Sequence, residues 1–102
     1  DWIACALGDA PVGLDIQYHR KIKVEQTARK ICNPEEWKLF QQADTERGKK
    51  DVLFQIWTKK ESYLKFTGEG IRRELCEISY EECSFYQLTM PDEYSGMICV
   101  GK

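Results

Sequence analysis

The chain has 102 residues, of which 42% are hydrophobic and 12% aromatic, and its 15 basic and 17 acidic residues give a formal net charge of −2. This composition excludes a disordered chain and supplies enough apolar surface for one core. The near balance of charge excludes a general attraction for polyanions, so a nucleic-acid partner would need a local basic patch. We therefore predict one folded domain over residues 1–102.

The first elements predicted along the chain are two strands. Residues 2–6 are short and apolar, and the turn residues from Gly8 to Pro11 follow them. Leu14, Ile16 and Tyr18 then alternate with polar neighbours, which is the two-residue period of a strand.

The spacing of apolar residues changes to a helical period after Lys23. The residues that form one stripe of this predicted helix are Val24, Ala28, Ile31 and Cys32. Asn33 and Pro34, followed by two glutamates, are typical of a helix start, because they supply an N-cap, a fixed φ and charges that suit the helix dipole. A second short helix carrying Trp37 and Phe40 is expected there, the alternative being one kinked helix that runs through.

The second half of the chain is interpreted as strands. Residues 51–58 are rich in β-branched and aromatic side chains, and a turn at 59–62 leads to a returning segment at 63–66, which predicts a hairpin. Three more strands are expected at 71–78, 83–90 and 95–101. Together these elements predict an α+β fold in which four or five antiparallel strands pack against one α-helix.

The cysteine content indicates an oxidising compartment. The five cysteines are Cys5, Cys32, Cys76, Cys83 and Cys99. No pair has C-x-x-C spacing and the chain has a single histidine, so we predict no metal site and no cofactor. The chain starts at Asp1 without an initiator Met or signal peptide, so a processed mature form is expected, and it contains no stretch long and apolar enough to cross a bilayer. Secretion is inferred from the cysteines alone.

His19 is the one imidazole available for acid–base chemistry. Cleavage of RNA by a small ribonuclease needs a general base, a general acid and a cation on the phosphate. His19 lies in a polar string beside Arg20 and Lys21, which favours the exposed end of a strand over a catalytic position. We therefore predict that the protein is not an enzyme and has no catalytic residues.

Three basic pairs near predicted turns or strand ends form a candidate surface for a partner protein or RNA. Its residues are Lys49, Lys50, Lys59, Lys60, Arg72 and Arg73. Aromatic residues lie between the pairs in sequence, and such a mixture can stack bases and contact phosphates. The alternative is that lysines at hairpin turns keep strand edges soluble while the aromatics belong to the core.

Two segments give the chain a family resemblance. An aromatic residue precedes the first cysteine in Trp2-Ile3-Ala4-Cys5, and Ile98-Cys99 places another cysteine near the C-terminus. The run from Phe54 to Leu64 looks like a central hairpin. In these features the chain resembles the ribonuclease-like secreted effectors of powdery mildew fungi, the RALPH class.

The resemblance implies a disulfide-stapled fold similar to that of fungal guanyl-specific ribonucleases, with a bridge between Cys5 and Cys99. It implies a non-catalytic virulence or avirulence effector that is delivered into a host plant cell, binds a host protein or RNA, and is recognised by an intracellular immune receptor. Two alternatives stay open. One is an active small ribonuclease that uses His19 with a carboxylate, and the other is a secreted inhibitor or toxin that displays the loop at residues 90–95.

Overall fold

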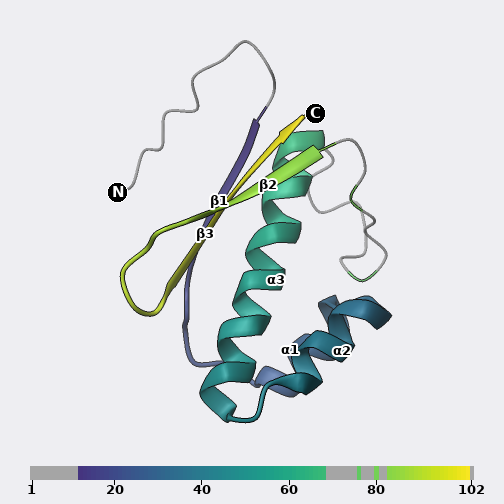
Figure 1. Cartoon of the computed structure of the whole chain (residues 1–102), viewed down its shortest axis with the longest axis vertical. Helices are drawn as coiled ribbons and strands as arrows, with labels where there is room; N and C mark the ends of the chain where they lie inside the picture. The colour runs from purple at the N-terminus through teal and green to yellow at the C-terminus, as the bar shows by residue number, and fades with distance from the viewer. Residues whose placement is uncertain (1–11, 69–75, 77–79, 81–82, 102) are drawn as a thin grey trace.

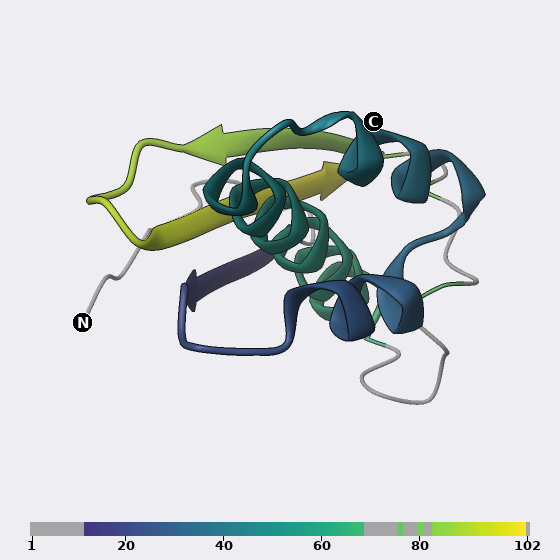
Figure 2. The same cartoon turned by 90° about the horizontal axis from the view of Figure 1, so that it is seen from below.

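The fold places one long helix between a small sheet and two short helices. The computed structural model describes residues 12–68, 76, 80 and 83–101. In chain order the elements are β1 (Val12–Tyr18), α1 (Val24–Ile31), α2 (Pro34–Gln42), α3 (Glu46–Thr67), β2 (Cys83–Leu88) and β3 (Tyr94–Gly101) (Figure 1). Figure 2 shows the sheet on one side of α3 and α1 and α2 on the other. The predicted α+β class is confirmed.

The described strands form one antiparallel sheet in the order β1–β3–β2. On β1 the register pairs Gly13 with Cys99 and Asp15 with Met97. These four side-chain positions are buried, so this face of the sheet packs against α3. Four or five strands were predicted, whereas the part of the chain that the structure describes contains three.

The predicted hairpin over residues 51–66 is wrong, because this segment belongs to the 22-residue helix α3. The helix begins after Thr45, whose hydroxyl accepts a hydrogen bond from the Gly48 amide (2.9 Å), and it ends at Gly68 in a left-handed conformation (φ 77°). The β-branched and aromatic residues suggested strands, but tertiary packing overrides that preference. The buried positions of α3 instead recur mostly at helical spacing, and they include Leu53, Ile56, Lys60, Tyr63 and Leu64.

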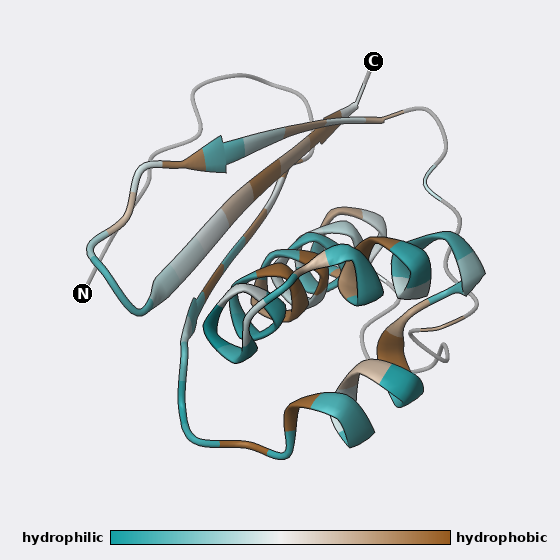
Figure 3. Cartoon of the chain, turned by 60° about the horizontal axis from the view of Figure 1, so that its bottom comes forward, coloured by the Kyte–Doolittle hydropathy of each residue, from teal (hydrophilic) through white to brown (hydrophobic). Residues whose placement is uncertain are grey.

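The two helices predicted between residues 24 and 42 are confirmed. At the start of α2 the Asn33 side chain accepts a hydrogen bond from the Glu36 amide (2.8 Å), and Glu36 accepts one from the Asn33 amide (2.9 Å). This reciprocal capping box fixes the N-terminus of α2. Figure 3 shows that hydrophilic turns of α1 and α2 face outward, while hydrophobic stretches lie on β3 and within α3.

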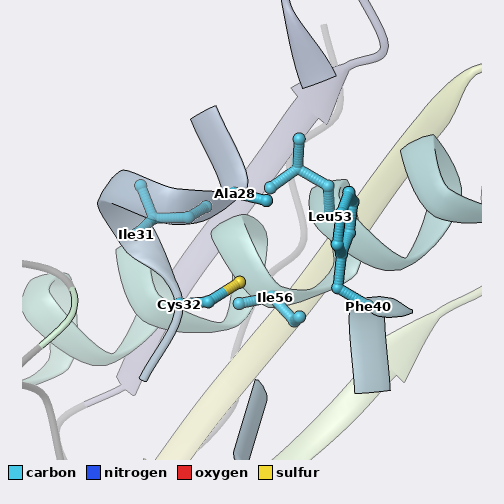
Figure 4. Close-up of a cluster of buried hydrophobic side chains, with 6 residues drawn as sticks. All are labelled: Ala28, Ile31, Cys32, Phe40, Leu53 and Ile56. Atoms are coloured by element: carbon cyan, nitrogen blue, oxygen red, sulfur yellow. The ribbon is translucent and has the colours of Figure 1, made fainter. Parts of the chain in front are cut away.

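The apolar core has two parts along α3. One cluster joins the three helices and consists of Ala28, Ile31, Cys32, Phe40, Leu53 and Ile56 (Figure 4). The other cluster joins α3 to the sheet through Tyr63, Leu64 and Cys99. Because α3 contributes to both clusters, its position determines how the sheet and the short helices sit relative to each other.

The predicted disulfide-stapled fold is wrong. Among the residues that the structure describes, all four cysteines are free thiols, namely Cys32, Cys76, Cys83 and Cys99. Burial raises the pKa of Cys32 to about 11 and that of Cys99 to about 12, so both thiols stay protonated near neutral pH. Cys5, the expected partner of Cys99, lies outside the described residues, as do the predicted strand at 2–6 and most of the one at 71–78.

Within the described ranges, none of the helices has the length and apolar character needed to cross a membrane.

Candidate functional site

The site is built where β1 crosses α3 at Gly13. A β-carbon added to Gly13 would lie 1.9 Å from the Ser62 carbonyl oxygen and 2.5 Å from the Phe66 amide nitrogen. Only glycine therefore lets the strand and the helix approach backbone to backbone. This close approach brings the next inward-facing residue of β1 within reach of side chains near the end of α3.

That next inward residue is Asp15, which is only 4% exposed. One of its carboxylate oxygens accepts a hydrogen bond from the Lys65 ammonium of α3 (2.7 Å), and the other accepts one from the Gln17 amide (2.8 Å). A buried carboxylate needs such partners, because removing it from water is costly. The two contacts therefore hold the Asp15 carboxylate in one orientation.

Lys65 and Glu61 extend the site along α3. The Lys65 side chain is 54% exposed, so the ammonium bridges the buried Asp15 and the solvent. Glu61 precedes Lys65 by four residues, which places the two on the same side of the helix, one turn apart. We call Asp15, Glu61 and Lys65 the diphosphate site, because two acidic side chains and an ammonium suit phosphate groups with a cation.

Two carboxylates beside an ammonium suit one kind of ligand. Magnesium is commonly bound in proteins by one or two carboxylates together with the phosphates of a substrate, and lysine contacts phosphate as a point charge. Across the described segments, no three His, Cys, Asp or Glu side chains cluster to hold a metal without such a substrate. The diphosphate site is thus suited to a phosphorylated ligand with a divalent cation.

His19 lies at the end of β1 away from this site, and its predicted exposed position is wrong. Its side chain is 10% exposed and stacks on Phe54 with a centroid distance of 4.5 Å. Its Nε2 lies 2.6 Å from the Ser95 hydroxyl, and its Nδ1 lies 3.5 Å from the Asp51 carboxylate. Ser95 is itself buried, so these contacts tie β1 to β3 and α3.

Acidification should weaken the fold through His19. Burial lowers the pKa of His19 below its usual 6.5, although Asp51 opposes the shift. The unfolded chain therefore binds a proton more readily, and stability is lost as the pH falls from about 6.5 through the lower pKa of the folded state. We expect the free energy of unfolding, measured in urea at pH 7.5 and 5.5, to drop more for the wild type than for His19→Gln. Equal drops would contradict this role.

The predicted basic surface is only partly a surface. Lys60 is fully buried and paired with Glu36, so it cannot contact a partner. Lys59 lies over the rings of Tyr80 and Phe85, at 4.6 and 4.8 Å from their centroids. Lys49 donates to the Phe40 carbonyl at 3.3 Å.

Lys49 and Lys59 are about 15 Å apart along α3, since a helix rises about 1.5 Å per residue. Lys50 is close enough to His19 to lower the pKa of that histidine. Arg72 and Arg73 lie outside the described residues. A partner surface made of the remaining lysines stays a prediction.

Sequence reasoning missed all three residues of the diphosphate site. In the sequence, Leu14 and Ile16 are the apolar residues that define the strand β1, but the residues of this strand that face α3 are Gly13 and Asp15. A glycine and an acid alternating within an apolar strand were the available signal. Glu61 was hidden because residues 59–62 were interpreted as a hairpin turn, where charged residues are ordinary.

Comparisons with known proteins identify the family of the chain. The family profile of the 4′-phosphopantetheinyl transferase superfamily matches residues 11–95. The chain is 34% identical over 71 residues to the 4′-phosphopantetheinyl transferase psf-1 of Bacillus pumilus, covering 70% of this chain and 30% of that protein. It is 27% identical over 96 residues to the 4′-phosphopantetheinyl transferase Sfp of Bacillus subtilis, covering 92% of this chain and 42% of that one. The chain thus spans less than half of these two relatives.

Solved structures show the same fold. A holo-[acyl-carrier-protein] synthase from Thermotoga maritima superposes with a TM-score of 0.72 at 13% identity, over 91% of this chain and 63% of that chain. A holo-(acyl-carrier-protein) synthase from Bacillus anthracis str. Ames, in complex with CoA, gives a TM-score of 0.72 at 16% identity, over 90% of this chain and 95% of that chain.

The predicted ribonuclease-like fold and the resemblance to powdery mildew effectors are therefore wrong. The segment from Phe54 to Leu64, interpreted as the central hairpin of that class, is helical. Trp2 and Cys5, which carried the rest of the resemblance, lie outside the described residues. The profile spans most of the chain, including β1 and α3 with the three residues of the diphosphate site, and the chain belongs to the 4′-phosphopantetheinyl transferase superfamily.

Proposed function

We propose that this chain transfers the 4′-phosphopantetheinyl group of CoA to a hydroxyl group of an acyl carrier protein. The observation that carries the proposal is the buried Asp15 carboxylate, which lies 2.7 Å from the Lys65 ammonium of α3. Glu61 precedes Lys65 by one turn of the same helix. CoA contains a diphosphate, which is the group that these charges suit. The superfamily match and the CoA bound to the Bacillus anthracis synthase support this choice of donor.

The residues present fit a divalent cation at this site. Each Asp15 oxygen accepts one hydrogen bond from a protein donor, and a carboxylate oxygen can accept a second contact. Asp15 and Glu61 would hold the cation together with the CoA diphosphate, whose charge it would neutralise. The exposed side of the Lys65 ammonium would bind a phosphate oxygen and orient the diphosphate.

The reaction is a displacement at phosphorus. The carrier-protein oxygen forms a bond to the phosphorus that bears pantetheine, and the bond from that phosphorus to the bridging oxygen breaks. The electron pair of that bond leaves with 3′,5′-ADP, and the hydroxyl proton passes to water on the open Lys65 side. Because the protein does little covalent chemistry in such transfers, the rate enhancement comes from orientation of the reactants and stabilisation of charge.

This proposal replaces the prediction of a secreted effector without enzymatic activity. The non-enzymatic effector is wrong, because the superfamily and the named relatives are transferases. A host plant protein and an immune receptor have no support as partners, since the family is defined by phosphopantetheinyl transfer. Secretion into a host cell is also wrong, because it rested on the effector resemblance and on a disulfide framework that the free thiols contradict.

Glu61→Gln tests the assignment of the second carboxylate. We expect it to raise the magnesium concentration needed for half-maximal transfer and to lower the rate by roughly tenfold to a hundredfold, because an amide is a weaker ligand than a carboxylate. The measurement is the mass increase of an apo-acyl carrier protein incubated with CoA.

Glu46→Gln is the matched control, since Glu46 is exposed at the opposite end of α3. It should transfer at the wild-type rate. Equal magnesium requirements for wild type and Glu61→Gln would remove Glu61 from the site.

A further inference from the structure

An ion pair is buried inside the protein on a different flank of α3 from the diphosphate site. The Lys60 ammonium lies 2.7 Å from Glu36, and their side chains are 0% and 10% exposed. Glu36 also accepts hydrogen bonds from the Asn33 amide (2.9 Å) and from the Tyr80 hydroxyl (2.9 Å). The carboxylate thus joins α2, α3 and the segment that leads to β2.

Stability alone does not account for this pair. Two charges lose much of their hydration when they are buried, and apolar residues of similar volume often serve equally well or better. Tyr80 is drawn into the same network, and its pKa is raised by burial and by the adjacent Glu36 carboxylate. Unlike an apolar contact, the ion pair is directional, because its hydrogen bonds form only in one orientation of α3.

Lys60 is the residue immediately before Glu61. Successive residues of a helix differ by about 100° around its axis, so Lys60 points toward α2 while Glu61 lies on a different side. Where α3 meets β1, Gly13 has no side chain and sets the distance between helix and strand, while Asp15 contacts the helix only through the half-exposed Lys65 side chain. A long, half-exposed side chain restrains the rotation of the helix less than the buried ion pair does.

We propose that the Glu36–Lys60 pair is a positioning device that fixes the rotation of α3, so that Glu61 and Lys65 face Asp15 in the diphosphate site. This inference rests on the proposed function. A rotation of about 20° would move a carboxylate that lies about 6 Å from the helix axis by roughly 2 Å. Misplacement on the order of 1 Å can cost about a hundredfold in rate, so a small rotation matters.

The test removes both charges and keeps the shape. In the double variant Glu36→Gln/Lys60→Met, the carbonyl oxygen of the new glutamine side chain can still accept from the Asn33 amide, and no lone charge is left buried. We expect the variant to fold with a melting temperature near that of the wild type. We also expect the magnesium and CoA concentrations for half-maximal transfer to rise about fivefold or more.

Glu35→Gln is the matched control, because Glu35 is the neighbouring glutamate on α2 and is exposed. It should leave both half-maximal concentrations unchanged. If the double variant folds and keeps the wild-type concentrations, the pair has no positioning role. If the double variant fails to fold, the charge-retaining Glu36→Asp, which shortens the side chain by one methylene, takes its place with the same readout.

A wild-type chain that transfers nothing would count against the proposed function, whereas unchanged half-maximal concentrations in an active variant would count against the positioning role alone.

Discussion

Asp15→Asn is expected to reduce phosphopantetheinyl transfer about a hundredfold or more, because the variant loses the one fully buried charge of the diphosphate site. Asparagine keeps the shape of the side chain but is neutral. It can no longer hold the Lys65 ammonium by charge or balance a divalent cation. The measurement is the initial rate of carrier-protein modification at saturating CoA and magnesium.

The fold should survive this substitution. Lys65 is half exposed, so water can solvate its ammonium when Asp15 is neutralised, and we expect a loss of only about 1–2 kcal/mol in the free energy of unfolding. Asp92→Asn is the matched control, because Asp92 is exposed in the turn before β3. An Asp15→Asn variant that transfers at the Asp92→Asn rate would exclude Asp15 from catalysis.

Gly13→Ala is expected to have the largest effect on stability. The added methyl would lie 1.9 Å from the Ser62 carbonyl oxygen and 2.5 Å from the Phe66 amide nitrogen, and neither backbone atom can move without shifting α3. We expect a loss of about 3 kcal/mol or more. In a domain of this size that lowers the melting temperature by roughly 12–24 °C.

Gly101→Ala separates this close contact from the general cost of replacing a strand glycine. A methyl at Gly101 would lie 3.5 Å from the Phe66 ring, which is an ordinary contact distance. The melting temperature of Gly101→Ala should therefore stay within a few degrees of the wild type. Similar losses for both variants would mean that β1 does not cross α3 as closely as described.

The parts of the fold that could be predicted are those in which local sequence and final structure agree. The capping residue Asn33 with Pro34 and Glu36 identifies α2 from the sequence, and the apolar stripe from Val24 identifies α1. The last two strands were also predicted within a few residues. In these segments propensity, pattern and packing indicate the same element.

Helix α3 could not be predicted in this way because its buried stripe includes a lysine. Lys60 occupies a core position and is neutralised by Glu36, which lies 24 residues earlier in the chain. The apolar pattern of the sequence is therefore interrupted at Lys60, although the helix continues through it. The same misinterpretation hid the site, since Glu61 lies one turn from Lys65, the partner of Asp15, only if residues 46–67 are helical. The cysteines misled for a related reason, because Cys32 and Cys99 are small core side chains here.

The most direct test of the account follows both products of one reaction mixture. The full chain is incubated with CoA, magnesium and an apo-acyl carrier protein, and the 3′,5′-ADP released is compared with the modified carrier formed. The account predicts equal molar amounts of the two products, and about a hundredfold less of each, or lower still, with Asp15→Asn. Release of 3′,5′-ADP without modified carrier, or no turnover of CoA at all, would contradict it.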